Sequence, residues 1–110
     1  MNSDLEIEVL QLHAEICAGL ADPSRIMILY ELAYGPRNVT ELCKNLQMSQ
    51  PMTSRHLKVL RERGMVISER HGTVVQYRLA DQRLIEALDL LRAMLRDTLA
   101  RRAQLVDAIQ

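Results

Sequence analysis

The 110-residue chain has no tryptophan and no phenylalanine, and three tyrosines are its whole complement of Phe, Trp and Tyr. A core without large rings has to be built from aliphatic and methionine side chains. With 48% hydrophobic residues the chain has enough of these for one domain, which we place at 1–110. A monomeric core of this size is marginally stable, and this favours a dimer.

Other absences exclude whole classes of protein. Two cysteines, Cys17 and Cys43, are too few for a disulfide framework. No apolar run is long enough to span a membrane, and the acidic N-terminus lacks a signal-peptide pattern. We therefore expect a cytoplasmic protein with no membrane partner, in which both thiols are reduced.

Enzymatic motifs are missing as well. The sequence has no phosphate-binding loop, metalloprotease motif or nucleophile elbow. Its three histidines, His13, His56 and His71, fall on three different predicted elements, with no nucleophile paired to a base. We expect a protein that is not an enzyme and that needs no cofactor for catalysis.

The charge is balanced overall, with 14 basic and 14 acidic residues, but it is unevenly distributed. Residues 1–22 contain five acidic and no basic side chains, a net charge of −5. Residues 55–78 contain six basic and two acidic side chains, a net charge of +4. A basic patch on a neutral chain is a local signature of nucleic-acid binding.

That patch begins on a predicted helix over 49–63. Ser49 is a suitable N-cap, Pro51 fits the first turn, and Gly64 fits a left-handed C-terminal cap. Leu57 and Leu60 share one face. The other face carries polar and basic residues that suit phosphates and base edges: Gln50, Ser54, Arg55, Lys58 and Arg61. By itself this pattern is equally typical of a solvated basic face.

A predicted hairpin follows directly. Residues 66–70 and 74–79 alternate as strands do, and His71-Gly72-Thr73 forms the tip between them. An isolated hairpin is marginal in water, so this one must pack on the helices. The tip would then project with Arg70 beside it, placed to touch a DNA backbone or minor groove. A helix-turn-helix over 39–63 with a wing over 66–79 is the order of a DNA-binding winged helix.

The flanking segments are predicted helices. They cover 5–20, 23–34, a short stretch from 38 or 40 to 46, and 82–108, with the wing strands before the last helix. The fold expected is mainly α with a small β-hairpin wing. The last helix carries an apolar stripe longer than one small domain needs. We expect 5–20 and 82–108 to form a homodimer interface, the alternative being that the last helix packs on its own domain.

The sequence contains three blocks in this order: Ala-Asp-Pro-Ser-Arg-Ile-Met-Ile-Leu at 21–29, Ser-Gln-Pro-Met-Thr-Ser-Arg-His-Leu-Lys-Val-Leu-Arg at 49–61, and Tyr-Arg-Leu at 77–79. Together they resemble the ArsR/SmtB family of bacterial metal- and stress-sensing repressors. The resemblance extends from about residue 12 to 105. It implies a homodimeric winged helix-turn-helix repressor that binds a palindromic double-stranded operator and releases it when an inducer binds.

The resemblance also implies which residues contact DNA. Those at the major groove are Ser49, Gln50, Thr53, Ser54 and Arg55. Lys58 is better placed for phosphate, and the wing contacts come from Arg70, His71, Gly72 and Thr73. For His56 we favour a structural hydrogen bond over a base contact. Gln50 and Arg55 are able to recognise adenine and guanine, respectively, with two hydrogen bonds each.

The sensor sites of the family are not matched. Its cysteine pair aligns with Asn38 and Thr40, neither of which is a soft ligand. Its zinc site aligns with about Asp81, Arg83, Met94 and Asp97, among which there is no histidine. We therefore assign no metal site with confidence.

Three residues remain as a possible sensor of another design. His13 and Cys17 share a helical face that Cys43 could approach. They could hold a soft metal or metalloid inducer, the two thiols could report oxidation, or the cysteines could simply pack in the core. A small apolar inducer between protomers is a further possibility. The alternative functions are a related DNA-binding protein without metal or thiol sensing, and a winged-helix module that binds protein.

Overall fold

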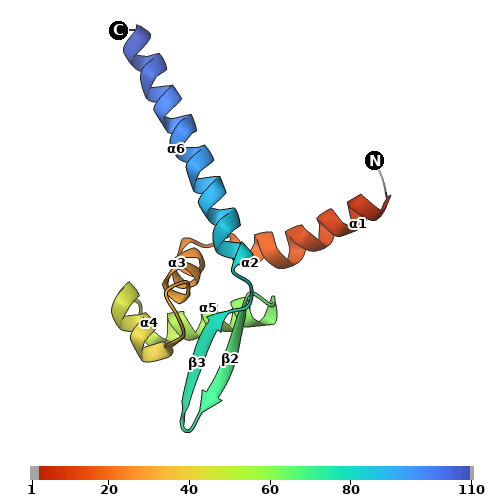
Figure 1. Ribbon diagram of the computed structural model, residues 1–110, viewed down its shortest axis with the longest axis vertical. Coiled ribbons are helices and arrows are strands. Elements are labelled where there is room, and N and C mark those ends of the chain that lie inside the picture. The colour runs from red at the N-terminus through yellow and green to blue at the C-terminus, as the bar shows by residue number, and fades with distance from the viewer. Residues whose placement is uncertain (1–2, 110) are drawn as a thin grey trace.

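The computed structural model describes residues 3–109 and consists mainly of helices, with a small sheet whose hairpin extends from one end (Figure 1). The elements, in chain order, are α1 (Ser3–Leu12), η1 (His13–Cys17), α2 (Ala18–Leu20), α3 (Pro23–Leu32), β1 (Arg37–Asn38), α4 (Val39–Leu46), α5 (Gln50–Glu62), β2 (Val66–His71), β3 (Val74–Leu79) and α6 (Arg83–Ile109). This is the winged helix-turn-helix that the sequence predicts, with α4 and α5 as the helix-turn-helix and β2–β3 as the wing.

Local capping chemistry sets where the inner helices begin. The Asp22 side chain accepts from the Ser24 amide at 2.8 Å ahead of α3, with Pro23 in its first turn. Asn38 and Glu41 form a reciprocal capping box at the start of α4. Ser49 caps α5 as predicted, and Gly64 after its end has a φ of +74°.

The core lies where α3, α4, α5, the sheet and the start of α6 meet. Its buried hydrophobic members are aliphatic or methionine side chains, as a chain without Phe or Trp requires. The buried hydrophobic residues are Ile28, Leu29, Leu32, Leu42, Leu57, Leu60, Met65, Val66, Ile85 and Leu88.

A third strand joins the predicted hairpin. β1 pairs antiparallel with β3, so that Arg37 lies opposite Tyr77, and the strand order is β1-β3-β2. β2 and β3 pair from Val66 opposite Leu79 to His71 opposite Val74. The turn is therefore shorter than predicted: His71 belongs to the strand, and Gly72 and Thr73 alone form the tip.

Two helical segments project from this core (Figure 1). The N-terminal arm (3–20) is a continuous helical segment whose middle, η1, is a π-helical turn that the sequence did not predict. The C-terminal arm is the part of α6 beyond Leu88. α1 has no buried residue, and the last buried residue of α6 is Leu88. Over the described residues the molecule measures 61 × 41 × 22 Å.

Within residues 3–109, no helix is both long enough and apolar enough to cross a membrane.

Shortening a core side chain should destabilise the whole domain. Leu29, fully buried on α3, is replaced by alanine, and we expect the free energy of unfolding in urea to fall by about 2–5 kcal/mol because a cavity remains. Tyr34→Ala is the control, since the Tyr34 side chain is 81% exposed, and it should change stability by less than about 0.5 kcal/mol. Equal losses in both variants would contradict this assignment of the core.

Candidate nucleic-acid interface

The two faces of α5 have opposite surroundings. Thr53, Leu57 and Leu60 are buried against the core. The opposite face is exposed along its length, and its side chains are Gln50, Ser54, Arg55, Lys58 and Arg61. The 13-residue helix is about 20 Å long and presents this polar and basic row to solvent. The geometry is that of a helix whose buried side fixes it and whose outer side is free to enter a groove.

Thr53 differs from the expectation that it contacts DNA. Its side chain is fully buried, its hydroxyl donates to the Ser49 carbonyl at 2.8 Å, and the Cys43 thiol donates to that hydroxyl at 3.4 Å. The hydroxyl is thus used inside the protein to join α4 to α5. We therefore remove Thr53 from the set of DNA-contacting candidates.

His56 lies at the border between the two faces of α5. It is half-buried, and its Nδ1 is 3.4 Å from Nη1 of Arg25 on α3. This contact agrees with the structural role that we favour for His56.

The end of the wing is exposed at Arg70 and His71 of β2 and at Gly72 and Thr73 of the tip. Gly72 has a φ of +67°, which glycine adopts without strain in a tight hairpin turn. At the base of the tip Arg78 Nε donates to the Glu69 carboxylate at 2.8 Å, and this hydrogen bond lowers the pKa of Glu69. His71 lies 3.6 Å from the same carboxylate.

Fewer basic side chains are free to bind a partner in the folded protein than the sequence suggests, because two of them are paired within the chain. Arg78 is paired with Glu69, and Arg63 donates to the Ala14 carbonyl and lies 4.0 Å from the Glu15 carboxylate. The basic side chains left for an external partner on α5 and the wing are Arg55, Lys58, Arg61 and Arg70.

The residues considered for a sensor do not form one site within the protomer. Both cysteines are free thiols: Cys17 is exposed, and Cys43 is partly buried beside Thr53. Among residues 3–109, no three His, Cys, Asp or Glu side chains are grouped so that they could hold a metal ion. The proposed set of His13, Cys17 and Cys43 is therefore not assembled.

A salt bridge occupies the carboxylate that aligns with the family's zinc site. Arg83 Nη2 lies 2.6 Å from Asp81 Oδ2, and the Arg83 amide also donates to Asp81. These hydrogen bonds lower the pKa of Asp81 to about 2. The Asp81 carboxylate is therefore ionised and paired with the Arg83 guanidinium.

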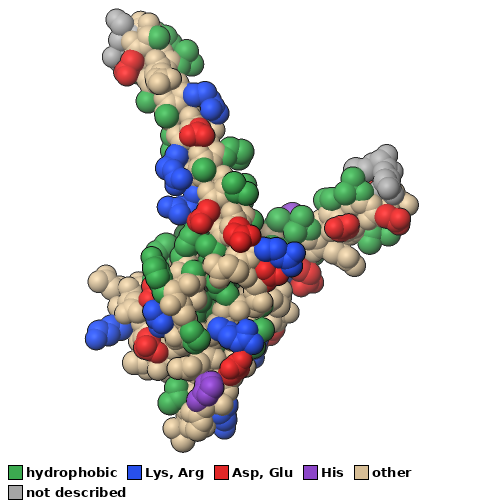
Figure 2. All heavy atoms as spheres, viewed as in Figure 1, with side chains coloured by type: hydrophobic (Ala, Val, Ile, Leu, Met, Phe, Trp, Pro, Cys, Tyr) green, Lys and Arg blue, Asp and Glu red, His purple; other side chains and the backbone are tan. Residues whose placement is uncertain are grey.

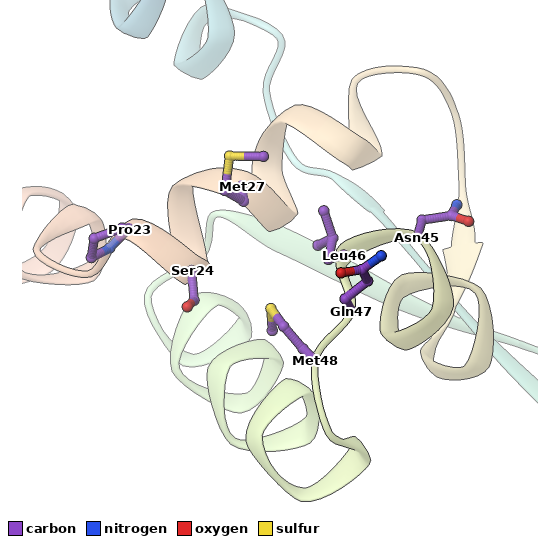
Figure 3. Close-up of a pocket in the computed structure, with 7 residues that line it drawn as sticks. All are labelled: Pro23, Ser24, Met27, Asn45, Leu46, Gln47 and Met48. Carbon is purple, nitrogen blue, oxygen red and sulfur yellow. The ribbon is translucent and has the colours of Figure 1, made fainter.

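An open pocket of about 360 Å³ lies between α3 and the end of α4 (Figure 3). None of the side chains that line it titrates: they are Pro23, Ser24, Met27, Asn45, Leu46, Gln47 and Met48. Gln47, with a left-handed φ of 54°, ends α4 at its rim. The pocket holds no acid–base pair for catalysis.

Both arms carry exposed apolar side chains (Figure 2). Of the 18 large hydrophobic residues that are exposed within residues 3–109, five lie on α1 and eight on the C-terminal arm: Leu5, Ile7, Val9, Leu10, Leu12, Leu90, Leu91, Met94, Leu95, Leu99, Leu105, Val106 and Ile109. Exposed apolar side chains in this number on two projecting helices are typical of an interaction surface.

The chain is similar in sequence to known bacterial regulatory proteins. Residues 22–68 match the family model described as bacterial regulatory protein, arsR family. The chain is 44% identical over 77 residues to the HTH-type transcriptional repressor SmtB of Mycobacterium tuberculosis, covering 70% of this chain. The match spans little more than half of that repressor, 57% of its length.

Two further relatives are matched over more of their length. A probable mercury resistance operon repressor of Streptomyces lividans is 32% identical over 87 residues, which cover 79% of this chain and 70% of that protein. A solution structure from Mycobacterium bovis, described as a homodimeric winged helix-turn-helix DNA-binding domain, superposes with a TM-score of 0.76 at 28% identity. It covers 89% of this chain and 91% of the other.

Removing the Thr53 hydroxyl should affect stability. In Thr53→Val the shape is kept, but the Cys43 thiol loses its acceptor, and we expect the free energy of unfolding to fall by about 1 kcal/mol. Thr73→Val, at the exposed wing tip, is the matched control and should change little. Urea denaturation of the reduced proteins measures both; an unaltered Thr53→Val protein would show that the buried hydroxyl contributes nothing.

Proposed function

The chain belongs to the ArsR family of bacterial regulatory proteins, and we propose that it acts as a homodimeric transcriptional repressor that binds double-stranded operator DNA. The observation that carries this proposal is the exposed row of polar and basic side chains along α5, backed by a buried face that holds the helix in place. An α-helix presented in this way fits the major groove of B-form DNA.

Separate roles follow for the exposed residues. Gln50 and Arg55, in the first half of α5, would read base edges, with Ser49 and Ser54 beside them. Lys58 and Arg61 extend the row toward the phosphates. The wing adds Arg70 and His71 at the adjacent backbone or minor groove. Phosphate contacts fix the register of the protein, and base contacts provide sequence preference.

A dimer is the second part of the proposal. The apolar surfaces of α1 and the C-terminal arm would be buried against a second copy, as the homodimeric M. bovis relative supports. An open pocket of about 640 Å³ lies where the arms diverge, between Leu12 and Ile16 on one side and Leu84 and Ala87 on the other. Two α5 helices related by a two-fold axis would read a palindromic site.

The relatives do not supply an inducer for this chain. The matched region covers 70% of the mercury resistance repressor and 57% of SmtB, so neither relative is matched over its whole length. The ligand set His13, Cys17 and Cys43 is not assembled within the described residues. Operator binding and dimerisation are therefore the functions proposed, without a metal or thiol sensor.

Two arginines should affect DNA binding in different ways. The wild-type protein is measured by fluorescence anisotropy against a duplex selected from random-sequence DNA, over a range of salt concentrations. Arg55→Ala should cost about 1–3 kcal/mol and relax the preference for one base pair, because a base contact is lost. Arg70→Ala should weaken binding to all duplexes alike and reduce the salt slope by about one, because a phosphate contact is lost.

Arg96→Ala on the exposed surface of α6 is the control for loss of charge alone. Binding that does not respond to salt, or no DNA binding by the wild-type protein, would refute the proposed function. It would favour the alternative of a winged-helix module that binds protein.

A charge within the apolar surface of the C-terminal arm should dissociate the dimer. Leu95→Glu is expected to raise the dimer dissociation constant by at least about tenfold, since a carboxylate would be desolvated at the interface. Ala100→Glu adds the same charge about one turn further along, on the opposite face of α6, and should leave the dimer intact. Sedimentation velocity measures both; a wild-type monomer at micromolar concentration would contradict this interface.

A further inference from the structure

Two arginines whose guanidinium groups bind within the chain join the N-terminal arm to the rest of the domain. Arg25, on α3, donates from Nε to the Gly19 carbonyl at 2.7 Å and from Nη2 to the Ala18 carbonyl at 3.3 Å. Its third nitrogen, Nη1, lies 3.4 Å from Nδ1 of His56 on α5. The Arg25 side chain is only 16% exposed. One guanidinium therefore contacts the last carbonyls of the arm and the middle of α5 together.

The direction of the His56 contact follows from its chemistry. A guanidinium has only donors, so a hydrogen bond at this contact runs from Arg25 Nη1 to Nδ1 of His56. Asp22 Oδ2, 4.0 Å from Arg25 Nη1, balances part of the guanidinium charge. The contact joins α3 and α5 across 31 residues of sequence.

The second arginine, Arg63, lies at the end of α5. Its Nη1 donates to the Ala14 carbonyl, and Glu15 lies 4.0 Å away. Ala14 belongs to the π-helical turn η1, a distortion that in α-helices often accompanies functional sites. The two ends of the stretch 14–20 are thus bound by arginines that also contact or belong to α5.

Close packing of the Gly19 backbone against the side chains of Met65 and Arg63 also holds the stretch 14–20. A Cβ built on Gly19 would lie 2.0 Å from Cε of Met65 and 3.1 Å from Cδ of Arg63. Beyond this stretch the arm has no buried residue in α1. The direction of the N-terminal arm relative to α5 is set at its base, by these contacts together with the packing of Ile16 and Leu20 against the core (Figure 1).

We propose that Arg25 and Arg63 are positioning residues that fix the angle between the N-terminal arm and α5, and so set the half-site spacing that the dimer accepts, without touching DNA. This rests on the proposed function, because the angle matters only when two α5 helices read one duplex. A tilt of about 10° moves the far end of a helix about 20 Å long by about 3–4 Å. This equals about one base-pair step, so small changes at the base of the arm alter the fit to DNA.

The test replaces each arginine by lysine, which keeps the positive charge but removes the branched guanidinium group. Arg25→Lys cannot reach two carbonyls and His56 together, although a lysine would still serve as a phosphate contact. Affinity is measured for the selected duplex and for the same duplex with one base pair inserted at its centre. We expect Arg25→Lys and Arg63→Lys to bind the selected duplex about tenfold more weakly and to lose much of the discrimination against the insertion.

The salt slope separates positioning from contact. A positioning residue leaves the slope of log affinity against log salt unchanged, whereas losing a phosphate contact lowers it by about one. Arg96→Lys, on the exposed surface of α6, is the matched control and should behave as the wild-type protein. Wild-type affinity and spacing preference in the Arg25 and Arg63 variants would overturn the proposal. A lowered slope, or weaker binding with the spacing preference intact, would do so as well.

A readout without DNA keeps the two proposals distinguishable. Hydrogen exchange of the free protein should become faster in the stretch 14–20 and in α5 together when Arg25 is replaced. His56→Ala breaks only the link from Arg25 to α5, so its effect should not add to that of Arg25→Lys. Unchanged exchange or full additivity would overturn the positioning role. A wild-type protein that fails to bind DNA would instead refute the proposed function, even where the exchange result holds.

Discussion

The burial of one face of α5 is the constraint on which the rest of the structure depends. Leu57 and Leu60 are almost fully excluded from solvent, and with Thr53 they hold the helix against α3 and α4. Because the core has no large aromatic rings, it is filled by aliphatic side chains and Met65, which leaves it small. The opposite face of α5 is exposed as a consequence, and its polar and basic row is held in one orientation by a packed rather than a flexible support.

A small core also explains the arms. The domain can cover α3, α4 and the first turns of α6, but it has no remaining surface to cover α1 or the end of α6. Apolar residues there, such as Leu10 and Leu95, would be costly to expose in a monomer and would be covered in the proposed dimer. In the proposed dimer, stability and DNA recognition would be linked, since the contacts that complete the hydrophobic surface would also place two α5 helices on one duplex.

The positive charge that the folded protein presents to a partner is smaller than the net charge of residues 55–78 suggests. Arg63 and Arg78 both contribute to the net positive charge of 55–78, yet each binds an acidic or carbonyl oxygen of its own chain. Arg25 likewise uses its guanidinium inside the protein. The charge that remains for a partner is concentrated on α5 and the wing tip. Arginine thus has two roles here, and only contacts across the fold separate them.

The sequence by itself determined the features that depend on near neighbours. Capping by Asp22 and Ser49, the end of α5 at Gly64 and the two wing strands follow from residues a few positions apart, which is why they could be predicted. The pairing of β1 with β3, the burial of Thr53, the π-helical turn with its Arg63 contact, and the separation of the candidate sensor residues could not. The tertiary structure decided them, because each depends on distances between segments far apart in the chain, which helical or strand periodicity does not encode.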